Sequence, residues 1–73
     1  MDKIPVAKHL SDDDYKLLLT VYADHTRTMG LKKRENYTAS HIVKVEKNVK
    51  ENCLNVHYEN GDWWKYYKNG TWG

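Results

Sequence analysis

Two copies of a six-residue pattern, Tyr-x-Asn-Gly-x-Trp, lie near the end of the chain, at residues 58–63 and 67–72. Asn-Gly between two β-prone runs favours a two-residue type I′ hairpin loop, because both central residues of that turn need positive φ. The repeat spacing of nine residues fits hairpins within one sheet, and it is much shorter than the repeat of a solenoid. The pattern therefore predicts a twisted antiparallel β-meander over residues 53–72.

Loop length also predicts which side chains share a face of this sheet. If Asn-Gly is the whole loop, the Tyr and Trp of each repeat lie opposite each other, and successive side chains of a strand alternate between faces. The predicted core face then carries Leu54, Val56, Tyr58, Trp63, Tyr67 and Trp72. The other face carries His57, Trp64 and Tyr66, flanked by Cys53 and Asn55.

A helix is predicted over residues 11–29. Ser11 is a good N-cap, and Asp14 stands at the capping-box position three residues later. From Tyr15 onward, apolar residues recur at the spacing of one helical face. Gly30 supplies a left-handed stop. The helix is therefore amphipathic, with one apolar face available for a sheet.

Residues 30–40 lack periodicity and are predicted to form a connection. Residues 41–47 are rich in β-branched types and are predicted to be the first strand. The sequence thus predicts a single α+β domain over residues 1–73. In this domain one N-terminal amphipathic helix packs on a three- or four-stranded antiparallel β-meander at about residues 41–72.

A chain of 73 residues buries a small core and often needs a disulfide, a structural metal or self-association. Cys53 is the only cysteine, which excludes an intrachain disulfide, and the four histidines are not at metal-ligand spacing. We expect neither a metal nor a cofactor, and self-association is the option left. Without an apolar leader or a run of ~20 apolar residues, the chain is expected to be cytoplasmic.

The face with His57, Trp64 and Tyr66 has no predicted helix to cover it. Contiguous exposed aromatic surface commonly marks an interaction site, so these three residues form the candidate interaction surface. Three interpretations remain open: residues 1–9 or 31–40 fold over the patch as a second small core, the patch is a homo-oligomer contact, or it binds a different protein.

A basic run, Lys32, Lys33 and Arg34, is the candidate nucleic-acid contact. The net charge is only +2, but residues 1–31 hold four Lys/Arg against five Asp/Glu, whereas residues 32–73 hold eight against five. Such a run beside an aromatic sheet face resembles the arrangement of single-strand binders. The alternative is a solvated charged loop.

Catalysis is not expected from this sequence. Cys53 and His57 share a face, but four residues of strand separate them by about 13 Å, too far for a thiolate–imidazole pair. The chain also has no Gly-rich phosphate loop and no nucleophile elbow. The preferred function is therefore a non-enzymatic protein–protein interaction module. The alternatives are a small nucleic-acid-binding module and a structural homo-oligomer subunit.

The segment from Leu54 to Tyr67, closing with Asn69-Gly70-Thr71-Trp72, resembles the C-terminal hairpins of small uncharacterised proteins from phages and prophages of low-GC Gram-positive bacteria. It is most similar to short Bacillus prophage proteins of the SPβ type. The resemblance covers about the last quarter of the chain. It implies a location in the host cytoplasm and an accessory role, such as binding a host protein or defence factor.

Overall fold

The computed structural model describes residues 3–73, so residues 1–2 of the predicted domain lie outside the described part. One long helix is followed by short helical turns and a three-stranded antiparallel sheet in the order β1-β2-β3. The elements are η1 (Pro5–Ala7), α1 (Asp12–Arg27), α2 (Leu31–Arg34), η2 (Glu35–Tyr37), η3 (Ala39–His41), β1 (Ile42–Asn48), β2 (Cys53–Tyr58) and β3 (Trp63–Tyr67). This is the predicted α+β meander.

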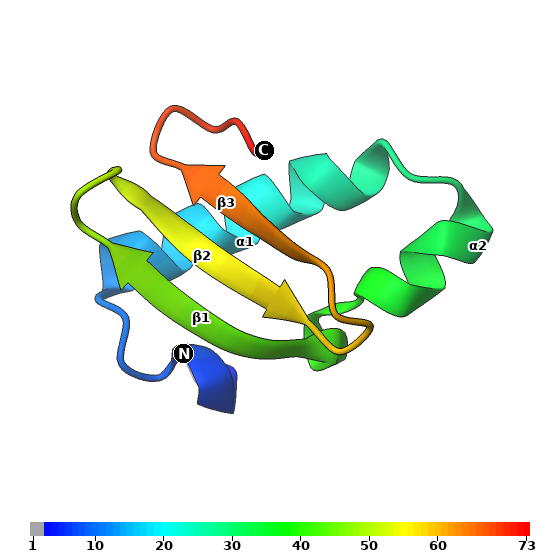
Figure 1. Cartoon of the computed structure of the whole chain (residues 1–73), viewed down its shortest axis with the longest axis horizontal. Helices are drawn as coiled ribbons and strands as arrows, with labels where there is room; N and C mark the ends of the chain where they lie inside the picture. The colour runs from blue at the N-terminus through cyan, green and yellow to red at the C-terminus, as the bar shows by residue number, and fades with distance from the viewer. Residues whose placement is uncertain (1–2) are drawn as a thin grey trace.

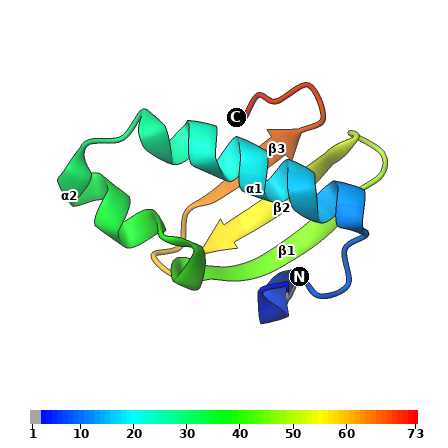
Figure 2. The same cartoon turned by 180° about the vertical axis from the view of Figure 1, so that it is seen from behind.

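The molecule has two layers, with α1 lying across one face of the sheet (Figures 1 and 2). No helix within residues 3–73 lies over the opposite face, which is turned toward the viewer in Figure 1. The N-terminal turn η1 packs beside the outer strand β1. We call the uncovered side of the sheet the open face.

Helix α1 begins where the sequence predicts. Ser11 is the N-cap, and its hydroxyl accepts a hydrogen bond from the backbone N–H of Asp14 at 3.2 Å. The helix ends at Arg27, two residues before the predicted end. There the backbone N–H groups of Thr28 and Met29 donate to the carbonyls of His25 and Thr26, three residues back, which tightens the last turn. The short helix α2 then folds back against this end.

The predicted connection, residues 30–40, contains more secondary structure than its polar composition indicates. Residues 31–41 form α2, η2 and η3 in succession. The Arg34 side chain reaches back to the end of α1 and donates hydrogen bonds to the carbonyls of Thr26 at 3.0 Å, and of Arg27 and Met29 at 3.4 Å. These carbonyls lie at the helix end, where carbonyl oxygens lack intrahelical partners, so Arg34 acts as a C-terminal cap.

Both Asn-Gly repeats form hairpin turns, but the turn is one residue longer than predicted. The backbone N–H of Tyr58 donates to the carbonyl of Asp62 at 2.8 Å, and the N–H of Gly61 donates to the carbonyl of Tyr58 at 3.0 Å. Gly61 has φ of +93°, whereas Asn60 is not among the positive-φ residues of the described chain. This is a type I turn followed by a left-handed glycine bulge, a three-residue loop.

The second repeat adopts the same turn around Gly70, which has φ of +88°. The N–H of Tyr67 donates to the carbonyl of Thr71 at 2.8 Å. Beyond this turn, Trp72 forms a single bridge to Tyr66, and Gly73 exchanges two backbone hydrogen bonds with Lys65. The final segment therefore extends the ladder without forming a full fourth strand.

The extra loop residue changes the faces of β3. A slip of one residue moves every side chain of a strand to the other side of the sheet. In the structure Val56 pairs with Trp64 and Leu54 with Tyr66, and His57 lies beside Trp63. The prediction that Trp63 and Tyr67 are core residues is therefore wrong, as is the prediction that Trp64 and Tyr66 lie on the open face.

The core lies between α1 and the inner side of the sheet. Strand β2 supplies Leu54, Val56 and Tyr58, as predicted, and α1 supplies Tyr15 and Leu18. The other buried members of this cluster are Ala7, Leu10, Val21, Met29, Tyr37, Ile42, Val45 and Tyr66. Trp64 and Trp72 are partly buried and pack against it.

Candidate functional site

The open face displays three rows of side chains, each running across the three strands. The register places β1, β2 and β3 residues side by side in each row, and alternate residues point to this side. The first row is Lys44, His57 and Trp63; the second is Glu46, Asn55 and Lys65; the third is Asn48, Cys53 and Tyr67.

The first row is the most apolar part of this face. The Trp63 side chain is 51% exposed, and its ring stacks on the His57 imidazole with a centroid distance of 5.7 Å and an interplanar angle of 17°. A β-bulge between Ile42 and Lys44 accompanies a second exposed apolar residue, Val43, at 50%. An exposed aromatic ring held against a neighbour is a preordered contact group.

The charges on and beside this face are paired within the chain. Lys65 Nζ lies 2.9 Å from a carboxylate oxygen of Glu51, and Lys44 Nζ lies 3.7 Å from Glu46. The same Glu46 oxygen lies 3.2 Å from Nε2 of His57. Two lysines and two glutamates cancel, so the face carries no net charge when His57 is neutral.

Tyr66 and Trp64, two of the three predicted surface residues, belong to a buried cluster under α1. His25 is 3% exposed and Tyr66 is fully buried. Nδ1 of His25 lies 2.9 Å from the Tyr66 hydroxyl, which in turn lies 2.6 Å from the Tyr58 hydroxyl. The Trp64 and Trp72 rings flank the imidazole, with centroid distances of 4.7 and 5.1 Å.

Each tyrosine hydroxyl has one proton, so the hydrogen bonds run in one direction along these three side chains. Either Tyr58 donates to Tyr66 and Tyr66 to an unprotonated Nδ1 of His25, or a protonated Nδ1 donates to Tyr66 and Tyr66 to Tyr58. Burial, reinforced by the nearby Lys33 charge, lowers the pKa of His25 below its ordinary 6.5. Burial raises the pKa of Tyr58 to about 12 and also raises that of Tyr66, so both phenols stay protonated.

Sequence reasoning missed His25, although a signal was present. The apolar stripe of α1 includes Leu18 and Val21, and His25 falls seven residues after Leu18, on the same helical face. The face of α1 that packs on the sheet therefore includes a polar residue, His25. Only the position of Tyr66 beneath the helix shows why a histidine fits there.

The basic run lies on α2, which projects from the C-terminal end of α1 beyond the end of the sheet (Figures 1 and 2). Lys32 and Lys33 are exposed, whereas the Arg34 guanidinium already binds backbone carbonyls. The three residues therefore do not act as one group: two are free to meet solvent and one holds the helix end.

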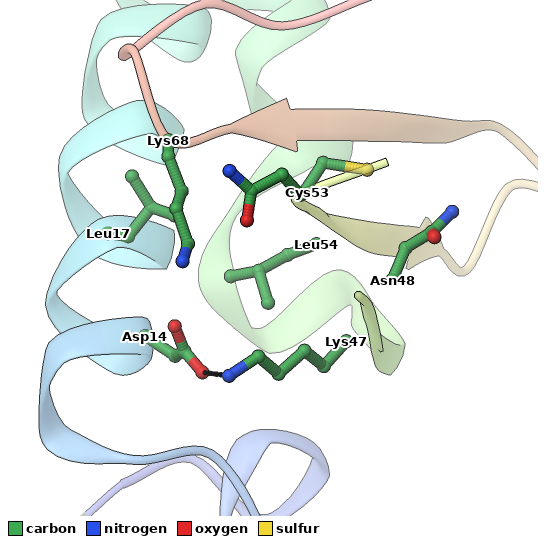
Figure 3. Close-up of a pocket in the computed structure, with 8 residues that line it drawn as sticks. Asp14, Leu17, Lys47, Asn48, Cys53, Leu54 and Lys68 are labelled. Carbon is green, nitrogen blue, oxygen red and sulfur yellow. Dashed lines mark ion pairs between the residues drawn. The ribbon is translucent and has the colours of Figure 1, made fainter. Parts of the chain in front are cut away.

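A close-up of one cavity shows where α1 is tied to the sheet edge (Figure 3). The Lys47 side chain reaches across to Asp14, with 2.9 Å between Nζ and the carboxylate, and this hydrogen bond lowers the pKa of Asp14. The cavity beside them, near Leu54 and Lys68, holds about 10 Å³. That volume has room for at most about one water molecule, so it is not a ligand site.

Two larger grooves flank the N-terminal segment. One, of about 450 Å³, runs along α1 at Tyr15 and Leu19, with Lys3 on its other wall. The second, of about 410 Å³, lies between Val6 and Ile42. Both are open surface depressions and lack a convergent set of buried polar groups.

Cys53, the only thiol, is buried at the edge of the open face. Burial raises its pKa, so it is a poor nucleophile. In the part of the chain that the structure describes, no three His, Cys, Asp or Glu side chains gather as metal ligands do. None of the helices within residues 3–73 is long and apolar enough to span a membrane.

Comparisons of the chain with protein-family models, with curated proteins and with solved structures found no significant match. The resemblance of the C-terminal hairpins to prophage proteins therefore stays a prediction.

Proposed function

We propose that this chain is a non-enzymatic protein-binding module and that its contact surface is the open face, centred on Trp63 and His57. The observation that carries the proposal is the exposed Trp63 ring stacked on His57. Tryptophan and tyrosine are enriched among residues that dominate binding energies at protein interfaces. The ring is already ordered, which lowers the conformational entropy lost on binding.

The charges favour a protein over a nucleic acid as the partner. Affinity for nucleic acid comes largely from Lys and Arg that neutralise phosphates, but both lysines in the rows of this face already lie near glutamates. Lys32 and Lys33 lie on α2, past the end of the sheet. We expect no binding of labelled single-stranded or duplex DNA at about 50 mM salt, where phosphate contacts are least screened.

The proposal includes a cytoplasmic location and a prophage origin for this protein. A single buried, unpaired cysteine is typical of a reducing compartment, which favours the cytoplasm. The resemblance of the C-terminal hairpins to prophage proteins implies that a heterologous partner would be a host protein.

A photo-cross-linking residue at position 63 tests the contact surface. Benzoylphenylalanine would replace Trp63 in one variant and Leu31 in the control, because Leu31 is 79% exposed but lies on α2. We expect discrete protein adducts from position 63 alone, suppressed by excess unmodified chain and not by excess Trp63→Ala. Equal adducts from both positions, or adducts removed only by nuclease, would refute the proposal.

A further inference from the structure

We infer that the partner of the open face is a second copy of this chain, packed face to face about a two-fold axis that runs parallel to the strands. This inference rests on the proposed function and names its partner. It follows from the order of charges and rings across the three rows.

Two symmetric arrangements of two such faces have to be compared. If the two-fold axis runs parallel to the strands, β1 of one copy faces β3 of the other. Each row then faces the same row of the second copy. If the axis runs across the strands, each strand faces the same strand of the second copy, which runs in the opposite direction. The first row of one copy then faces the third row of the other. Homodimers commonly use such isologous contacts, in which each residue pair occurs twice.

The positions of the charged residues distinguish the two arrangements. With the axis parallel to the strands, Glu46 faces Lys65 of the second copy, and the same contact forms again by symmetry. With the axis across the strands, Glu46 faces Glu46 and Lys65 faces Lys65. Like charges brought together at an interface are strongly unfavourable, so only the first arrangement is self-complementary.

The first row fits the same arrangement. Lys44 of one copy faces Trp63 of the other, and an ammonium group over an indole ring is an attractive pair. Asn48 then faces Tyr67, a polar contact at the far end of the face. The backbone does not change in this arrangement, but Lys65 and Glu46 exchange their contacts with Glu51 and Lys44 within the chain for contacts with the second copy.

The size of the face sets the strength of the contact. Three strands about 4.8 Å apart, each contributing about five residues with a rise of about 3.4 Å, give a footprint of roughly 15 by 17 Å. That is well below the ~800 Å² per partner of a standard interface. We therefore expect a reversible dimer with a dissociation constant that is roughly micromolar or weaker.

Sedimentation equilibrium at about 10 μM to 1 mM tests the inference through two single charge reversals. Glu46→Lys places two lysines opposite each other, and Lys65→Glu places two glutamates opposite each other, so each variant alone is expected to dimerise about tenfold more weakly than the unmodified chain. An equimolar mixture of the two restores both contacts. We expect the dissociation constant of that mixture to lie within about threefold of the value for the unmodified chain.

A matched mixture controls for net charge. Glu35→Lys changes the charge by the same amount as Glu46→Lys, at an exposed position on η2. It should leave dimerisation unchanged alone, and it should not rescue Lys65→Glu when the two are mixed. Circular dichroism of each variant confirms that the fold is intact.

Three results would overturn the inference: an unmodified chain that is monomeric at about 1 mM, a Glu46→Lys and Lys65→Glu mixture no better than either variant alone, or equal rescue by Glu35→Lys. A monomeric chain that still forms specific adducts from position 63 with another protein would overturn the second copy as partner and leave the proposed function standing. Failure of both experiments would remove both proposals.

Discussion

The two faces of the sheet are built from similar side chains and have opposite surroundings. Under α1, Tyr66 and Trp64 pack around His25 and their polar atoms are enclosed, whereas on the open face Trp63 stacks on His57 in contact with solvent. Each face thus holds a histidine among aromatic rings. The composition of an aromatic-rich strand therefore does not reveal its function, because the layer packed against each face decides whether a ring stabilises the fold or stays available for binding.

Truncation of the buried face should have the largest effect. Tyr66→Ala removes a fully buried ring, and loss of a large core aromatic costs about 3–5 kcal/mol, which is much of the stability of a domain this small. Urea unfolding followed by circular dichroism measures the loss. A Tyr66→Ala variant as stable as the unmodified chain would contradict the register.

Removal of single hydroxyl groups separates the contributions of the two faces to stability. Tyr66→Phe keeps the ring but interrupts the hydrogen bonds to His25 and Tyr58, and a buried polar group left without its partner costs about 1–3 kcal/mol. Tyr67→Phe, the matched change on the open face, should alter the free energy of unfolding by less than about 0.5 kcal/mol. Equal losses from the two variants would argue against separate roles for the faces.

The buried His25 should make the stability of the fold sensitive to acid. The lowered pKa of His25 means that the unfolded chain binds the proton more readily than the folded chain. The contribution of neutral His25 is therefore complete above about pH 6.5 and is lost as pH falls from there through the folded pKa, by up to about 1.4 kcal/mol per pH unit.

Denaturant unfolding at a series of pH values measures this slope. His25→Gln should flatten the slope between pH 6.5 and the folded pKa, whatever its effect on the stability itself. A separate loss is expected below the ordinary Asp14 pKa of 3.8, because Lys47 lowers the folded value. A slope that survives His25→Gln would assign the acid sensitivity to another group.

Truncation on the open face should have the smallest effect on folding. Trp63→Ala removes a side chain that is half exposed, so we expect a change below about 1 kcal/mol in the free energy of unfolding, together with loss of dimerisation at about 1 mM. Thermal unfolding and sedimentation of the same sample measure both. A large loss of stability without any loss of association would show that Trp63 is structural.

The sequence was sufficient where one pattern had one structural meaning. Ser11 predicted the helix start, and the alternation of Leu54, Val56 and Tyr58 with polar residues predicted the faces of β2 correctly, which also placed His57 on the open face. In both cases only one arrangement buries the apolar side chains.

Strand β3 was different because aromatic residues occupy both of its alternating sets: Trp63 and Tyr67 in one, Trp64 and Tyr66 in the other. Hydrophobicity cannot choose between them, so the faces depended on the loop. Asn-Gly fits a two-residue loop, and it also fits the last two positions of a three-residue loop in which only the glycine needs positive φ. The cap formed by Arg34 was equally hidden, since it depends on a fold-back of α2 that no local pattern signals.

Both faces of β3 carry aromatic residues, so either face could pack against α1. Deletion of Asp62, with Glu59-Asn60-Gly61 kept as the loop, would bring Trp63 opposite Tyr58, and every later side chain of β3 would change sides. Trp63 would then enter the interior and Trp64 would meet solvent. One lost codon would thus exchange the exposed and the buried aromatic residues of β3, so loop length decides which rings meet solvent as much as side-chain substitution does.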